Sequence, residues 1–181
     1  QEPGDIKVQD VDGNGVITTD DRIIYSQRPD VTFGFNNTFN YKGFDLSVFL
    51  YARLGQWIAY DYNTTYRINA LENGGNVDYW TPENPTNAFP RPNKSKSYTQ
   101  VTYYSTLKYE DGSFFKIRDI TLGYTFKPEL LKHLNLSRLR VYATAKNFFT
   151  FSKIDNYDPE QGGSISFPMT KQLVFGLNVE F

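Results

Sequence analysis

The chain has 181 residues, a formal net charge of −1 from 19 Lys and Arg against 20 Asp and Glu, one His and no Cys. The charge balance argues against nucleic-acid binding through phosphate neutralisation. The absence of Cys excludes disulfides, thiolate metal sites and Cys nucleophiles, and the lone His133 argues against histidine-rich zinc sites and most catalytic triads. Aromatic residues form 17% of a chain whose mean hydropathy is −0.53, which favours an all-β binding scaffold or part of a membrane β-barrel.

Residues 1–29 are polar and rich in turn-forming residues. They lack the basic start and apolar segment of a signal peptide. The chain has no run of about 18 apolar residues, so no transmembrane helix is expected. Because a turn motif begins as early as Asp10, we expect the chain to be a piece of a longer protein, with 1–29 forming a loop.

This turn motif resembles a calcium-binding loop. The template requires oxygen ligands at positions 1, 3, 5 and 12, a backbone carbonyl at position 7 and Gly at position 6, because alternate residues of a tight loop direct their oxygens to one centre. The expected ligands are Asp10, Asp12, Asn14, Val16 through its carbonyl, and Asp21. Asp21 is one methylene shorter than the usual Glu, and Asp20 is an alternative. We expect a structural calcium ion that stiffens the loop; the alternative is a metal-free loop of Asx turns.

Two segments after this loop alternate between apolar and polar residues with a period of two. Segment 31–41 places Phe33, Phe35, Phe39 and Tyr41 on one face, and segment 44–54 does the same with five apolar residues. This period predicts strands, and Lys42-Gly43 between them predicts a tight turn, so the two segments form a hairpin.

Residues 57–112 show no sustained alternation and are interrupted by Asn, Gly and Pro. A stretch this long without structure is unusual in a compact domain but suits a surface loop of a large barrel. A short helix near 58–71 is also compatible with the sequence. Among the rings of this loop, Trp57, Tyr79 and Trp80 are candidates for stacking against a substrate, and the alternative is that they pack within the loop.

The remaining sequence predicts three further strands. Segment 113–126 changes the parity of its apolar residues, which a bulge near Arg118-Asp119 would reconcile. Segment 127–136 predicts a helical connector, segment 137–149 a strand and segment 150–168 a loop. The last strand alternates cleanly from Leu173 to Phe181.

The predicted strands span roughly 10–14 residues, which is enough for a tilted strand to cross a bilayer. Short turns alternate with long loops, as in bacterial outer-membrane barrels. We therefore predict an all-β fold whose residues 30–181 are antiparallel strands of a large transmembrane β-barrel. A periplasmic C-terminus would place 1–29, 57–112 and 150–168 outside the cell. Phe181 would then be the terminal aromatic signal for the barrel-assembly machinery. The alternative fold is a soluble antiparallel sandwich.

Several segments together resemble one known family. They are GDIK at 4–7, DVTFGFNNTF at 30–39, KGFDLSVF at 42–49, DGSFFKIRDITLGYTF at 111–126, LRVYATAKNFFTF at 139–151 and YDPE at 157–160. These are similar to the C-terminal part of the SusC/RagA family of TonB-dependent outer-membrane transporters. The resemblance implies a 22-stranded barrel of which this chain forms the last five strands, with a plug, a TonB box and a signal peptide elsewhere. The family has no catalytic residues, so no enzyme is expected.

The expected function is therefore import of glycans or peptides through the outer membrane of a Gram-negative cell, energised through TonB. The resemblance implies as partners a SusD-like lipoprotein and the TonB complex, the latter through the N-terminal region outside this chain; outer-membrane lipid would surround the barrel. The alternative function is that of a soluble, calcium-dependent carbohydrate-binding β-sandwich. A glycoside hydrolase is disfavoured, because its pair of carboxylates at a fixed separation has no counterpart among the scattered acids.

Overall fold

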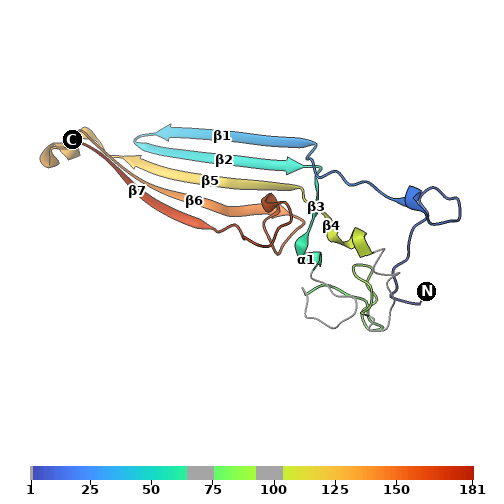
Figure 1. The fold of residues 1–181 in the computed structure, drawn as a ribbon. Helices are drawn as coiled ribbons and strands as arrows, with labels where there is room; N and C mark the ends of the chain where they lie inside the picture. The colour runs from blue at the N-terminus through green and yellow to red at the C-terminus, as the bar shows by residue number, and fades with distance from the viewer. Residues whose placement is uncertain (1, 65–75, 93–103) are drawn as a thin grey trace.

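The computed structural model describes residues 2–64, 76–92 and 104–181. Its main feature is one antiparallel five-stranded sheet in the order β1-β2-β5-β6-β7, which confirms the all-β class (Figure 1). Its strands are β1 Val31–Tyr41, β2 Phe44–Leu54, β5 Phe114–Thr125, β6 Arg138–Ser152 and β7 Gln172–Glu180. The other elements are η1 Thr19–Asp21, β3 Trp57–Ala59, α1 Asp61–Thr64, η2 Tyr104–Lys108, β4 Tyr109–Asp111, α3 Pro128–Leu131, η3 Lys132–Leu134 and η4 Pro159–Gln161.

Most predicted strands and turns are confirmed. Strands β1 and β2 have the predicted bounds and are joined by Lys42 and Gly43, whose φ values of 48° and 90° give the tight turn of a two-residue hairpin. The predicted connector at 127–136 contains α3 and η3. Strand β6 runs three residues beyond the predicted end at 149, because Thr150 and Phe151 continue to pair with β5.

The predicted bulge near Arg118-Asp119 is present. The register shifts between Phe49 and Leu50 on the β2 side of β5, and between Ile117 and Asp119 on the β6 side. This shift keeps the apolar residues before and after it on one face of the sheet, as the change in sequence parity required.

The two faces of the large sheet differ in chemistry. One face carries aromatic and aliphatic side chains that are largely exposed, with Phe39 at 61% and Phe175 at 77%. The other face carries polar and charged side chains, including Asp45 and Arg140. No second layer covers the apolar face within the three described ranges. The buried apolar cluster of Ile58, Tyr60 and Ile154 lies at one end of the sheet rather than on one of its faces.

The prediction that 57–112 lacks strands was wrong, because β3 and β4 pair there into a small second sheet. The two strands have three residues each, too few to show alternation in the sequence. Near the predicted helix at 58–71 the structure has α1, and residues 65–71 lie outside the described ranges. The loop between β6 and β7, residues 153–171, is called the last loop. Its Ile154 packs with Ile58 and Tyr60 into a small buried core.

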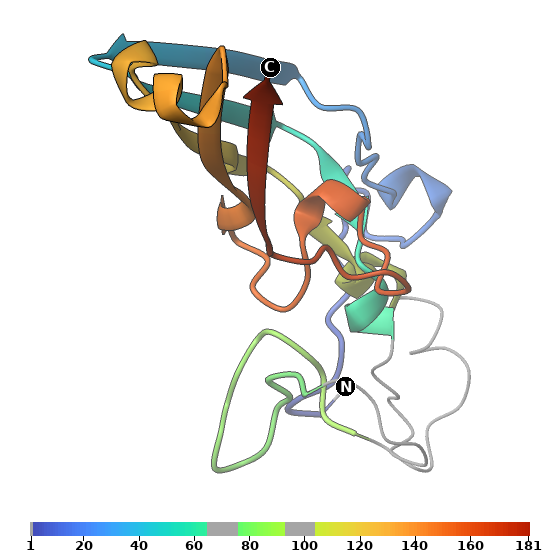
Figure 2. The ribbon, with the colours of Figure 1, turned by 90° about the vertical axis from the view of Figure 1, so that its left-hand side faces the viewer.

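The loops gather at the end of the sheet where this core lies. In Figure 1 the β1–β2 turn, α3 and the C-terminus lie at one end, and β3, β4, α1 and the N-terminal segment lie at the other. Figure 2 shows the same grouping after a quarter turn. Among the described residues, no helix has both the length and the apolar character needed to span a membrane.

Candidate functional site

The polar face of the sheet carries an ion pair between β2 and β6. Arg140 donates from Nε and Nη2 to the two carboxylate oxygens of Asp45, at 2.9 and 2.5 Å. The pair spans β5, where Gly123 leaves room for it: a Cβ at this position would lie 2.5 Å from Arg140 Nη2 and 2.5 Å from Asp45 Oδ1. Alternation places both charges on the polar face, and the glycine between them allows them to meet.

The N-terminal loop brings three of the predicted calcium ligands together. Carboxylate oxygens of Asp10, Asp12 and Asp21 lie within 4.8 Å of one another, although Asp10 and Asp21 are eleven positions apart in the chain. The loop is built by backbone donors. Gly13 and Gly15 each donate to Asp10, at 2.7 Å, and both glycines have positive φ values. Three carboxylates this close repel one another unless a cation or several hydrogen bonds offset their charge.

Asp21, rather than Asp20, lies beside Asp10 and Asp12. Its two oxygens accept from the backbone N–H groups of Thr18 and Val11, each at 2.7 Å, and these bonds hold the pKa of the Asp21 carboxyl below its usual value. Thr18 and Asp21 also form a capping box at the start of η1.

The other two predicted ligands, Asn14 and Val16, lie in the same turn. Asn14 Oδ1 accepts from the backbone N–H of Val16 at 2.8 Å, and Asn14 Nδ2 donates to Asp12 Oδ2 at 2.8 Å. The loop therefore has the oxygen-rich chemistry that calcium prefers.

The three aromatic candidates lie in two different places. Trp57, 37% exposed, packs on Tyr25 with ring centroids 4.5 Å apart. Trp80 instead lies against the N-terminal segment, since a Cβ at Gly4 would be 2.5 Å from its Cε3 atom. Tyr79, 43% exposed, belongs to the same segment as Trp80. The contacts of Trp57 and Trp80 thus place the two tryptophans in different parts of the structure and do not gather the three rings around one ligand.

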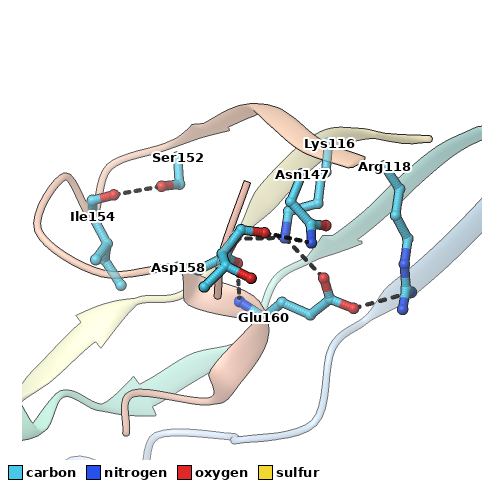
Figure 3. Close-up of polar contacts among 8 residues, drawn as sticks. Lys116, Arg118, Asn147, Ser152, Ile154, Asp158 and Glu160 are labelled. Carbon is cyan, nitrogen blue, oxygen red and sulfur yellow. Dashed lines mark hydrogen bonds and ion pairs between the residues drawn. The ribbon is translucent and has the colours of Figure 1, made fainter. Parts of the chain in front are cut away.

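The sequence did not indicate a charged cluster that joins β5 to the last loop (Figure 3). Lys116 Nζ lies 2.6 Å from Asp158 Oδ2 and 2.8 Å from Glu160 Oε2, and the other oxygen of Glu160 lies 3.0 Å from Arg118. Alternation places Lys116 and Arg118 on the polar face, but their partners are about 40 residues away, and only the tertiary structure shows that they meet.

Comparison with known proteins shows that the chain is similar to TonB-dependent receptors. No family model matches it. It is 31% identical to TonB-dependent receptor P3 of Formosa agariphila over 99% of its own length, and 31% identical to TonB-dependent receptor SusC of Bacteroides thetaiotaomicron over 95%. These matches cover 19% and 17% of the relatives, so the chain spans about a fifth of their length.

Two solved structures have the same fold over most of the chain. The structure of the RagAB peptide transporter superposes with a TM-score of 0.71 at 27% identity, over 88% of this chain and 18% of that one. The RagAB peptide importer in its closed-closed state gives 0.72 at 28% identity, over 95% and 20%. These relatives are named as receptors and transporters rather than as enzymes. The resemblance to the SusC/RagA family of TonB-dependent transporters, indicated by the sequence motifs, is confirmed by these relatives over almost the whole of this chain.

Proposed function

We propose that this chain forms the last five strands of the barrel of an outer-membrane transporter that imports nutrients with energy supplied through TonB. The observation that carries the proposal is the two-faced sheet. Each of its five strands carries exposed apolar side chains on one face, its polar face carries paired charges, and both edge strands have a single partner within the described residues. A closed barrel meets the needs of such a sheet, because lipid covers the apolar face and neighbouring strands pair with both edges.

The same reasoning gives the orientation and the partners. The end with short turns would face the periplasm, and the end with the small sheet and the long loops would face outside. There a SusD-like lipoprotein would cover the mouth, which is supported by the similarity of the chain to SusC and to the RagAB importer. Phe181 follows the last residue of β7 and is largely exposed, and we propose that the barrel-assembly machinery binds it. The plug and the TonB contact would lie in the rest of the longer protein.

For the cargo, the relatives point to two classes. The similar solved structures are those of a peptide transporter and a peptide importer, so we propose peptides as the first class to test and glycans as the second. A soluble carbohydrate-binding sandwich has no support from the sheet, because such a fold would cover the apolar face with a second sheet.

The test uses the full-length protein in its own cells. We expect it in the outer-membrane fraction, with a heat-modifiable band on gels, and we expect uptake of labelled oligopeptides or oligosaccharides to stop when TonB is deleted. Recovery in the soluble fraction without detergent would contradict the membrane assignment. Uptake that persists without TonB would contradict the energy source.

We further propose that the N-terminal loop binds calcium through Asp10, Asp12, Asn14, the Val16 carbonyl and Asp21. The support is the approach of three carboxylates to within 4.8 Å. Titration of the full-length protein with calcium should show one site that Asp12→Asn weakens by about tenfold or more, because a charged ligand is lost. The matched control is Asp20→Asn, which should leave the affinity within about twofold. Equal effects of the two substitutions would contradict this ligand set.

A further inference from the structure

We propose that Lys116 is the anchor that positions the last loop, residues 153–171, at the outer mouth. The effect on uptake rests on the proposed transport function, whereas the attachment of the loop to β5 does not. Lys116 projects from the polar face of β5, and its side chain is 0% exposed. A buried ammonium group is tolerated in a protein only when opposite charges or hydrogen bonds replace its water. Here Asp158 and Glu160, both from the last loop, take that place.

The two acids are held ready for this contact. Asp158 caps η4 by accepting from the backbone N–H of Glu160 at 3.0 Å, with the buried Pro159 between them. Asp158 thus uses one oxygen for the cap and the other for Lys116. Glu160 in turn divides its oxygens between Lys116 and Arg118 (Figure 3). Asp158 and Glu160, at the start of η4, therefore both contact the polar face of β5.

The opposite side of the loop is attached by different chemistry. Ile154 packs with Ile58 and Tyr60, and the backbone N–H of Asp61 donates to the carbonyl of Gly163 at 3.0 Å. Gly163 has a φ of 96° and lies directly against the Ala59 carbonyl, where a Cβ would overlap. These contacts do not involve Lys116. The loop is thus attached to β3 and α1 by apolar and backbone contacts and to β5 by the buried charges of Lys116, and an exposed ion pair of Lys153 joins it to β4.

Loss of the Lys116 ammonium group would release the side of the loop that contacts β5. Without that ammonium, the carboxylates of Asp158 and Glu160, each only 12% exposed, would lie against the polar face of β5. Among the described residues, Arg118 would be the only cation left within ion-pair distance. They would turn toward water and lift η4 from β5, while the contacts to β3 persist. The loop would then lose its fixed position over the mouth without loss of the barrel. Lys116 would act on substrate capture through the loop, as a positioning residue.

The test compares three variants of the full-length receptor. Lys116→Met removes the charge and keeps the length of the stem, and Lys116→Arg keeps the charge. The control Lys153→Met makes the same chemical change in the same loop, at a lysine that is 78% exposed and pairs with Asp111 at 3.0 Å. A heat-modifiable band shows in each case that the barrel has folded. If Lys116→Met does not fold, the double variant Asp158→Asn/Glu160→Gln removes the same attachment from the loop side.

We expect amide hydrogen exchange at 155–163 to rise about tenfold in Lys116→Met, with the large strands unchanged. Lys116→Arg and Lys153→Met should stay near the parent. The concentration for half-maximal uptake should rise about fivefold in Lys116→Met, with the maximal rate per folded receptor unchanged. Unchanged exchange at 155–163 would overturn the anchor, and a fall in maximal rate alone would overturn the positioning role. If the parent receptor imports nothing, the proposed function fails, and the exchange result still decides whether Lys116 anchors the loop.

Discussion

Gly123→Ala tests whether the ion pair across the polar face stabilises the sheet. The added Cβ is fixed by the backbone and would lie 2.5 Å from both Arg140 Nη2 and Asp45 Oδ1, so these side chains must separate. Two hydrogen bonds between charged groups would be lost, each worth about 1.5–3 kcal/mol in favourable cases. Because the two side chains are 18% and 23% exposed and face water once separated, we discount this sum to about 1–3 kcal/mol.

The matched control is Gly34→Ala, also on the polar face. There the nearest atom to an added Cβ is Phe49 Cε2 at 3.7 Å, an ordinary contact, and the φ value is not positive. Both substitutions gain similar stability, about 0.4–1 kcal/mol, from a less flexible unfolded chain. The difference between the two in the free energy of unfolding therefore isolates the ion pair.

The assay is urea unfolding of the folded full-length receptor in lipid vesicles, followed by loss of heat-modifiable migration. We expect Gly123→Ala to be less stable than Gly34→Ala by about 1–3 kcal/mol, and we expect most of this difference to vanish when Arg140→Met is also present. Equal stability of the two glycine variants would refute the reasoning. A difference that persists without Arg140 would show that another contact of Gly123 is responsible.

Three further predictions concern the loops and the C-terminus. Burial raises the pKa of Tyr60 above its ordinary value of 10.0. The contribution of the neutral phenol to the free energy of unfolding should therefore be complete below pH about 10 and be lost as the pH rises through the folded pKa. Tyr60→Phe should flatten this decline in alkaline unfolding curves. Gly4→Ala should detach the segment around Trp80 and speed proteolytic cleavage within 76–92. Gly162→Ala, also at a positive φ but with open space around it, should not, and equal cleavage would contradict the contact. Phe181→Ala should lower the folded fraction in the outer membrane at equal synthesis, as measured by heat-modifiable migration, and an unchanged fraction would contradict the assembly role.

The sequence by itself determined the large sheet. Alternation with a period of two is encoded within each strand, so it located β1, β2 and β7, the Lys42-Gly43 turn and even the bulge near Arg118, where the parity of the apolar residues changes. The calcium-loop pattern is equally local, since its residues span a dozen positions of a single turn. In such elements the residues that interact are neighbours in the chain.

Only the tertiary structure decided what happens at the end of the sheet that carries β3, β4 and the loop between β6 and β7. Strands β3 and β4 have three residues each and are separated by about fifty positions, so neither carries a periodic signal of its own. The partners of Lys116 depend on where the last loop folds back, and those of Arg140 on the register of three strands. Alternation states which face of the sheet a charge occupies. Which opposite charge it meets is a matter of register and loop packing, and these form only when distant segments come together.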